Sequence, residues 1–321
     1  MITFQNALDI IRSQPVTVEQ EIVSIYNALD RVLAEDVLSD IAIPPFDVSA
    51  MDGFACKRSE KNMELHVIET IAAGQMPQNI VESGTCARIM TGAMIPEGAD
   101  SVVMFEHTHE IDNKVRVIKF TDNLNIRYRG EDASVGDLLL SKGTMITSAA
   151  CAVLATAGRK QVIVAKKPLV GIIATGNELV EPDVVPSGAH IRNSNSYQLF
   201  AQALRCSAVP EYFGIADDTI DETKKIILKA ENAADLILIS GGVSAGDFDC
   251  VPSALKECGY ELLIQSVAVK PGKPTVFGRK GNKFVFGLPG NPVSNFVLFE
   301  LFVRPFICAL MGNVYKPLCI T

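Results

Sequence analysis

Two polar, glycine-rich segments in the C-terminal half of this 321-residue sequence have residue types that suit anion binding. They are Thr-Gly-Asn-Glu (175–178) and Ser-Gly-Gly-Val-Ser-Ala-Gly-Asp-Phe-Asp (240–249). Adjacent glycines and hydroxyls in the longer segment let backbone N–H groups approach an anion, and we predict a helix from about residue 251. The segment lacks the Lys-Ser/Thr ending of a P-loop and the Gly-x-Gly-x-x-Gly spacing of a dinucleotide-binding fold.

Two further segments combine positive charge, proline and a helix cap. Lys-Pro-Gly-Lys-Pro (270–274) carries Lys270 and Lys273 on a proline-stiffened turn, which suits a phosphate or another oxyanion. In Leu-Pro-Gly-Asn-Pro-Val-Ser (288–294), Asn291 is predicted to cap a helix that begins at Pro292. An ordinary turn or cap also explains each segment by itself.

The elements around these segments predict an α/β domain. Near-continuous apolar strands that alternate with helices indicate βαβ units and a parallel sheet covered on both faces. The predicted strands are Leu169–Ala174, Asp235–Ser240, Leu262–Val269 and a short one near 208–213. The predicted helices lie near 195–206, 220–233 and 251–258. Such sheets bind ligands beyond the carboxyl ends of their strands, so the four segments are expected at one sheet edge, which favours anion binding.

The N-terminal half has a different character. Apolar spacing predicts helices over 3–13 and 18–36, whereas the following region, to about 137, is rich in short β-branched segments. Within it, Glu110–Val117 reads as a hairpin with Asp112-Asn113 at the turn. A helix is predicted at Ser148–Gly158. The predicted domains are N-terminal helices (1–38), a β-rich insert (39–137), a bridging segment (138–167) and the α/β domain (168–321).

Composition narrows the class of protein. The sequence is 48% hydrophobic, so it can bury a core, and its net charge of −8 argues against a general binder of nucleic acid or anionic membranes. The most apolar stretch, Phe296–Leu310, is interrupted by Glu300 and Arg304, and the N-terminus lacks signal-peptide features. We expect a cytoplasmic protein whose eight cysteines are free thiols.

Three segments of the insert add charged or hydroxyl groups beside a glycine. They are Ser-Ala-Met-Asp-Gly-Phe (49–54), Arg-Ile-Met-Thr-Gly-Ala (88–93) and Arg-Tyr-Arg-Gly-Glu-Asp (127–132). Each alone is as well explained by a turn with a solvated charge.

Taken together and in this order, these strings resemble the molybdopterin molybdenumtransferase family, the bacterial relatives of the gephyrin E domain. The matching strings are those at 49–54, 88–93, 129–132, 240–244, 270–274 and 288–294. The resemblance runs from about residue 4 to residue 310. Six strings in register make it specific, whereas a single Gly-Gly pair would not.

The resemblance implies an elongated homodimer with its active site between subunits, built from an adenylyltransferase-like α/β domain and the β-rich insert. It implies that adenylylated molybdopterin and molybdate react to give molybdenum cofactor and AMP with Mg²⁺, and that the molybdopterin adenylyltransferase is a partner. The small C-terminal β domain usual in the family is not found in this sequence. Asn177 stands where an acidic residue is common.

Carried over residue by residue, the resemblance also implies a site. It assigns catalytic roles to Asp52, Thr91, Asp132, Glu178 and Asp249. It assigns substrate binding to Arg127, Thr175, Gly176, Ser240, Gly241, Gly242, Ser244, Lys270, Lys273, Pro289, Gly290, Asn291 and Pro292. Because carboxylates repel anionic ligands unless a metal lies between them, we expect Asp217, Asp249 and Glu178 to bind Mg²⁺.

Two other functions compete with this interpretation. One is an adenylyltransferase on the same α/β fold, which the presence of the insert disfavours. The other is a gephyrin-like scaffold that binds peptides, which the retained polar site residues disfavour. The sequence leaves open whether molybdate or tungstate is preferred, because the two oxyanions are close in size and charge.

Overall fold

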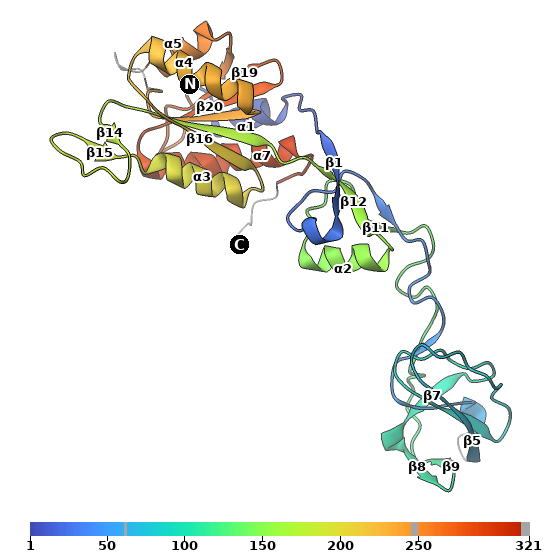
Figure 1. The fold of residues 1–321 in the computed structure, drawn as a ribbon. Helices are drawn as coiled ribbons and strands as arrows, with labels where there is room; N and C mark the ends of the chain where they lie inside the picture. Colours follow the sequence, from blue (N-terminus) through green and yellow to red (C-terminus); the bar gives the residue numbers. More distant parts are fainter. Residues whose placement is uncertain (61–62, 245–249, 316–321) are drawn as a thin grey trace. The chain divides into compact units, whose positions relative to one another are not determined.

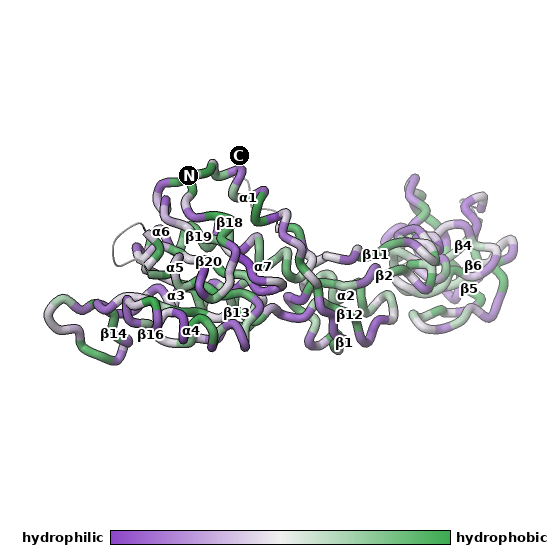
Figure 2. The backbone as a smooth tube through the Cα atoms, turned by 90° about the horizontal axis from the view of Figure 1, so that it is seen from above, coloured by the Kyte–Doolittle hydropathy of each residue, from purple (hydrophilic) through white to green (hydrophobic). Residues whose placement is uncertain are grey.

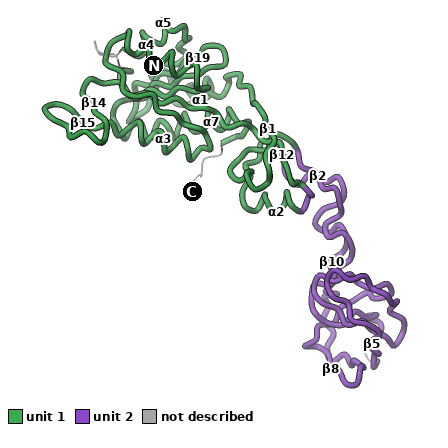
Figure 3. The backbone as a smooth tube through the Cα atoms, viewed as in Figure 1, with its two compact units in different colours: residues 1–35, 141–155, 159–321 green, residues 36–140, 156–158 purple. Residues whose placement is uncertain are grey.

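The computed structural model describes residues 1–60, 63–244 and 250–315, and the chain divides into two compact units (Figures 1 and 3). Unit 1 comprises residues 1–35, 141–155 and 159–321, and unit 2 comprises residues 36–140 and 156–158. The β-rich insert was predicted at 39–137, within unit 2. The predicted bridging segment, 138–167, falls mainly in unit 1.

Unit 1 is built on a mixed sheet. Its strand order is β16 (Val209–Ala216), β13 (Leu169–Thr175), β17 (Leu236–Ser240), β20 (Lys283–Leu288), β19 (Val276–Lys280), β18 (Glu261–Ile264). The first four strands run parallel, whereas β19 is antiparallel to β20 and β18 is antiparallel to β19. The central strands are almost entirely buried, as their apolar sequences predict (Figure 2).

The prediction of a parallel sheet was wrong at one edge, where β19 is antiparallel to both of its neighbours. The strand predicted at Leu262–Val269 ends at Ile264 and pairs antiparallel, because the tight β19–β20 hairpin turns the chain back. Residues beyond Ile264 have other backbone partners: the N–H of Val267 donates to Lys273 O at 3.0 Å, and that of Ala268 donates to Ile2 O at 2.7 Å.

Helices cover both faces of this sheet (Figure 1). One face packs against α1 (Phe4–Arg12), α3 (Asn195–Arg205) and the helical segment 292–310. The other face packs against α4 (Ile220–Ala233) and α5 (Val251–Glu257). Alternate residues along the central strands pack into the core on one face or the other. The predicted positions of α1, α3, α4 and α5 are confirmed.

The last helical segment combines α6 (Pro292–Leu298), a π-helical turn (Phe299–Val303) and α7 (Arg304–Leu310). Among the described residues, this is the one helix that is long and apolar enough to cross a membrane. From the sequence, Glu300 and Arg304 were interpreted as an interruption of the apolar stretch, but two charged residues are too few to bring the segment below that threshold. Those two side chains form an ion pair, and Phe299, Phe302 and Phe306 are buried in the sheet core of unit 1. The segment packs as a core helix.

The helix predicted over 18–36 is wrong. The chain instead forms β1 (Gln20–Ser24), which pairs antiparallel with β12 (Gln161–Ala165), followed by a 3-10 turn at Ile25–Asn27. The helical spacing of apolar residues was coincidental, since Ile22 is 67% exposed and Leu29 is 53% exposed. The predicted helix in the bridging segment is confirmed as α2 (Ser148–Thr156).

Unit 2 is β-rich. Its main sheet has the order β7 (Ser101–Met104), β4 (Gly53–Cys56), β6 (Thr85–Ile89), β5 (Glu64–Ile71), β9 (Lys114–Val117), β8 (Thr108–Ile111). The predicted hairpin is β8–β9, and its turn residues Asp112 and Asn113 have φ of 48° and 62°, as a two-residue hairpin turn requires. Where the chain enters and leaves unit 2, β2 (Val37–Leu38) pairs with β11 (Leu138–Leu140).

Candidate functional site

A cavity of about 340 Å³ lies in unit 1, where the parallel strands β13, β17 and β20 reach their carboxyl ends. Its lining combines glycine backbone, hydroxyl and amide groups with three charged side chains and several apolar ones. The lining residues are Thr175, Gly176, Glu178, Leu179, Ile191, Arg192, Asn193, Ser194, Asn195, Asp218, Ser240, Gly241, Gly242, Gly290 and Pro292. Segments predicted from three strand ends therefore meet in one place, as parallel topology requires.

Glycine is required at the end of β17. Gly241 has a φ of +98°, and a Cβ built there would lie 2.5 Å from the backbone oxygen of Thr175. Gly242 has a φ of +63°, and its Cβ would lie 2.8 Å from the Thr175 hydroxyl. A side chain at either position would clash with Thr175, so the close approach of the β13 and β17 ends requires glycine at both.

Buried amide and hydroxyl groups form the floor of the cavity. The Nδ2 group of Asn195 donates to Ser240 Oγ at 2.9 Å and to Gly290 O at 2.8 Å. Behind Ser240, the Nδ2 group of Asn295 donates to the same oxygen at 2.9 Å. Ser240 and Asn295 are 3% and 0% exposed. Three buried atoms here, Thr175 Oγ1, Asn195 Oδ1 and Asn295 Oδ1, have no hydrogen-bond partner among the described residues.

Two carboxylates line the cavity. Glu178 folds back over Gly176, where the missing Cβ leaves room for its carboxylate. Asp218 joins the β13 and β16 ends, since its Oδ2 accepts from the N–H of Asn177 and its own N–H donates to Asn177 Oδ1, both at 3.1 Å. Asp217, the expected metal ligand, is exposed and is not among the lining residues.

Other predicted residues of unit 1 lie elsewhere. Lys270 and Lys273 line a separate, open cavity of about 530 Å³ with Met1, Val267, Ala268, Val269, Gly272 and Pro274. Ser244 is exposed and, like Pro289, does not line the first cavity. Asp249 lies outside the described residues. Among the described residues, no three His, Cys, Asp or Glu side chains are grouped as metal ligands.

The predicted helix cap is confirmed. Asn291 Oδ1 accepts from the N–H of Ser294 at 3.1 Å, and α6 begins at Pro292. Gly290 and Pro292 line the cavity, and the capping residue Asn291 does not. The cap therefore fixes the turn that carries the lining residues.

The polar segments of unit 2 also converge. Asp52 Oδ1 accepts from the Thr91 N–H at 2.6 Å and the Thr91 hydroxyl at 2.8 Å. These bonds, the one from the backbone N–H first, hold the pKa of Asp52 below its usual range. Arg127 forms an ion pair with Asp132, and its own strand, β10 (Ile126–Arg127), pairs with β3 (Val48–Ser49) just before the Asp52 segment.

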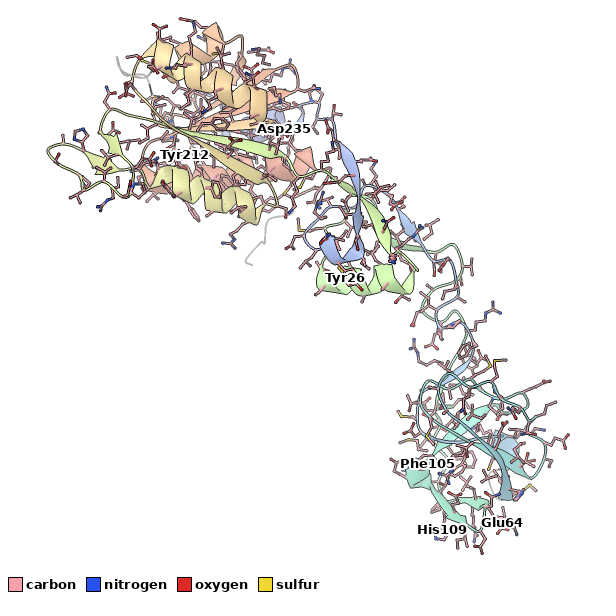
Figure 4. All side chains as sticks on the ribbon, viewed as in Figure 1. Tyr26, Glu64, Phe105, His109, Tyr212 and Asp235 are labelled. Atoms are coloured by element: carbon pink, nitrogen blue, oxygen red, sulfur yellow. The ribbon has the colours of Figure 1, made fainter. Side chains whose placement is uncertain are left out.

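The six-stranded sheet of unit 2 carries Arg88, on β6, close to two aromatic rings. Its guanidinium lies 5.1 Å from the centre of the Phe54 ring and 5.2 Å from that of the Phe105 ring, and it forms an ion pair with Glu110. Figure 4 labels Phe105 in unit 2. Arg88 is thus held by contacts within unit 2 and is not a free cation.

Sequence reasoning missed a group of lining residues. Arg192, Asn193, Ser194 and Asn195 connect β15 (Ile191–Arg192) to α3, and Asp218 follows β16. The available signal was the run Arg-Asn-Ser-Asn-Ser (192–196), a polar string directly before a predicted helix. Asp218, not its neighbour Asp217, lines the cavity, a distinction that depends on backbone geometry after the strand.

The fold and the glycine-lined polar cavity define an α/β protein whose cavity lies at the carboxyl ends of parallel strands, the place where such proteins commonly bind anionic ligands. Comparison with known proteins is more specific. Residues 2–158 match the family model described as MoeA N-terminal region (domain I and II), and residues 171–309 match that of a probable molybdopterin binding domain.

Curated relatives and solved structures agree. The chain is 40% identical to the molybdopterin molybdenumtransferase of Bacillus subtilis (strain 168), over 92% of this chain and 71% of that protein. It is 38% identical to the one of Staphylococcus aureus (strain MRSA252), over 97% and 76%. The crystal structure of a molybdopterin biosynthesis MoeA protein from Pyrococcus horikoshii OT3 matches with a TM-score of 0.82 and 32% identity, covering 98% and 80%. The chain belongs to the molybdopterin molybdenumtransferase family.

Proposed function

We propose that this transferase inserts molybdenum into molybdopterin, converting adenylylated molybdopterin and molybdate to molybdenum cofactor and AMP. Family membership supports the reaction. The observation that carries the assignment of the site is the cavity of unit 1, whose glycine backbone, hydroxyl and amide groups suit a phosphorylated ligand. The open turn with Lys270 and Lys273 would hold further negative charge.

In this proposal the residues of the cavity bind and orient the ligand. Gly241 and Gly242 let the backbone approach a phosphoryl group closely, and Ser240 and Asn195 offer fixed polar atoms beside it. Most of these groups are uncharged, so they hold an anion by geometry and directed dipoles instead of by net charge. Exclusion of bulk water by the buried floor strengthens each of these bonds.

Magnesium is part of the proposal. Glu178 and Asp218 place carboxylate oxygens, the ligand type that Mg²⁺ prefers, on the wall of an anion site, where carboxylates alone would repel the ligand. The donor chemistry therefore fits a divalent cation, with Asp249 as a further candidate ligand. When bound, the ion would neutralise phosphoryl charge and polarise the bond that releases AMP. Asp217, the earlier candidate, is the weaker one because it does not line the cavity.

We also propose a cytoplasmic homodimer in which the Asp52, Thr91, Arg127 and Asp132 group of one protomer completes the site of its partner. The motivation is that polar segments matched by the family lie in two separate compact units. The adenylyltransferase that makes the substrate would be a partner, and unit 1 would share its fold. Light scattering checks the dimer: a monomer at micromolar concentration would contradict it.

The reaction is tested by AMP release. Purified chain is mixed with adenylylated molybdopterin and Mg²⁺, with and without molybdate, and AMP is quantified by chromatography. We expect AMP release that depends on the chain and is coupled to formation of molybdenum cofactor when molybdate is present. Release of no AMP under any condition, or synthesis of the adenylylated compound from ATP as the only activity, would overturn the proposal in favour of a scaffold or an adenylyltransferase.

A further inference from the structure

We propose that Asn195 and Asn295 are positioning residues that force the hydroxyl proton of Ser240 to point toward an oxyanion oxygen in the cavity. The inference deepens the proposed function and rests on it for the class of ligand. It starts from the two amides that meet at Ser240 Oγ, each at 2.9 Å.

The backbone determines which amide atom faces Ser240. Nδ2 of Asn195 also lies 2.8 Å from Gly290 O, and Nδ2 of Asn295 lies 3.2 Å from Pro289 O. A carbonyl oxygen can only accept, so a flipped amide would set two acceptors against each other in a buried space. Each Nδ2 group therefore gives one hydrogen to a carbonyl and the other to Ser240 Oγ.

Counting lone pairs then fixes the role of the hydroxyl. A serine hydroxyl has two lone pairs and one proton, and both lone pairs of Ser240 Oγ are occupied by these amides. The group is left as a donor only. In the hydrogen bonds of the described residues Ser240 Oγ only accepts, and the buried hydroxyl of Thr175, another lining residue, has no partner among those residues.

A buried donor without an acceptor is destabilising unless a ligand or water completes it. Ser240 lines the cavity and is 3% exposed, so its proton is available to a bound molecule and to little else. Two N–H groups donating to Oγ polarise the O–H bond and make it a better donor. An anionic oxygen is the acceptor that gains most, since charge-assisted hydrogen bonds are about twice as strong as neutral ones.

The cavity offers a second, complementary atom. Asn195 is among the residues that line the cavity, and its buried Oδ1 has no hydrogen-bond partner among the described residues. It accepts only, so the preferred ligand carries an N–H or O–H group near its oxyanion. A phosphate ester bearing hydroxyl groups has both, whereas molybdate supplies the oxyanion alone. The shared chemistry at Ser240 is a tetrahedral oxyanion oxygen.

The test is a double-mutant cycle on binding. Calorimetry measures the affinity of AMP, and separately of molybdate, for the wild-type chain, Ser240→Ala, Asn295→Leu and the double variant. Asn295 does not line the cavity and is fully buried, so it can affect binding only through other residues. Leucine fills similar space without N–H groups. Asn295→Ser serves as the second variant if Asn295→Leu does not fold.

We expect Ser240→Ala to weaken the anion that binds there by roughly ten- to a hundredfold, the loss of one charge-assisted bond. Asn295→Leu should weaken it in the same direction, and adding it to Ser240→Ala should change nothing further, because Asn295 acts through the hydroxyl. A purely structural role of Asn295 would instead give additive losses. The arm that responds, AMP or molybdate, identifies the source of the oxyanion.

Gln202 provides a matched control. It is a buried amide on the same helix as Asn195, and its Nε2 donates to Glu300 Oε1 at 2.8 Å, away from the cavity. Gln202→Met should cost stability but leave both affinities unchanged. Unchanged affinity in Ser240→Ala, additive losses in the cycle, or a wild-type chain that binds neither anion would each overturn the inference.

This outcome is separable from that of the proposed function. A non-additive cycle without any AMP release from adenylylated molybdopterin would retain the positioning role and reject the reaction. AMP release by the wild-type chain together with an additive cycle would support the reaction and reject the positioning role.

Discussion

Unit 1 and unit 2 each gather polar side chains, and they do so with different chemistry. In unit 1 the floor of the cavity consists of Thr175, Ser240 and Asn195, which are nearly buried and uncharged. In unit 2 the comparable group is charged and exposed: the side chains of Arg127 and Asp132 are 45% and 51% accessible and paired with each other.

The difference separates two ways of holding a ligand. Buried amides and hydroxyls are fixed by folding, so they select a ligand by position and are little affected by salt. Exposed ion pairs contribute only about 0–1 kcal/mol to stability and are screened by salt, so their partners exchange easily. Arg127 can therefore leave Asp132 for an anion at low cost, whereas Ser240 cannot turn away from its amides.

The largest effect is expected at Gly241. Alanine there must adopt a φ of +98° and would place Cβ 2.5 Å from Thr175 O, so Gly241→Ala should abolish AMP binding and cost about 1–3 kcal/mol of stability from backbone strain alone. Calorimetry and urea denaturation measure the two effects. Gly281→Ala is the matched control: its φ is +58° and no atom lies within 4 Å, so binding should persist. Normal AMP binding by Gly241→Ala would contradict the claim that the buried groups of unit 1 select a ligand by their fixed positions.

The carboxylates come next. Glu178→Gln should lower AMP release at limiting Mg²⁺ by on the order of a hundredfold, if the metal supplies several kcal/mol and Glu178 helps to hold it. Asp217→Asn removes the same charge from an exposed residue outside the cavity and should leave the rate within about twofold, a change worth under 1 kcal/mol. The reverse order of effects would support the original assignment of Asp217.

Lys270 and Lys273 allow a test of ligand binding by exposed charges within unit 1. Replacing both Lys270 and Lys273 with Gln should weaken AMP binding by about 2–3 kcal/mol at low salt, the range for hydrogen bonds to charged groups. The difference from wild type should shrink as salt increases, because both side chains are exposed. The exposed Lys256 on α5 is the control, and Lys256→Gln should bind normally. A loss that does not depend on salt would contradict this account of the turn.

The smallest effect concerns Asp52. Its pKa is lowered by the Thr91 N–H and hydroxyl, so the carboxylate form is favoured in the folded state. Its stabilising contribution should be fully present above the usual carboxyl pKa of 3.8 and disappear as pH falls through the lower folded value. Thr91→Val removes only the hydroxyl, so carbon-13 NMR titration should find the Asp52 pKa raised but still below 3.8. A pKa at or above 3.8 in that variant would assign the effect to the hydroxyl alone.

Local signals in the sequence predicted much of unit 1. Leu169–Ala174 and Asp235–Ser240 were recognisable because strands buried on both faces are continuously apolar. The polar segments directly after them became the cavity wall. Signals that a single element carries, such as the Asn291 cap and the Asp112-Asn113 turn, were equally readable.

What the sequence did not predict depends on contacts between distant segments. The antiparallel partner of β18 is β19, which the β19–β20 hairpin places between β18 and the parallel strands. Strand β1 exists because Gln161–Ala165 pairs with it. Asn195 and Asn295 meet at Ser240 from two helices that are far apart in the chain. Neither residue carries a local mark that separates it from an ordinary polar residue near a helix start.

The pairing of β1 with β12 has a consequence for the order of folding. These strands flank the whole of unit 2, so an unfolded chain must close a very long loop to join them, and loop-closure entropy opposes this. Folding of unit 2 brings β2 beside β11, which shortens that loop to the few segments outside them. During synthesis β12 also emerges after residues 36–140. We therefore expect the amides of unit 2 to gain protection from exchange before those of the β1–β12 pair during refolding. Folded unit 2 would then hold the two segments of the chain that form this pair close together, so that unit 1 can complete its folding.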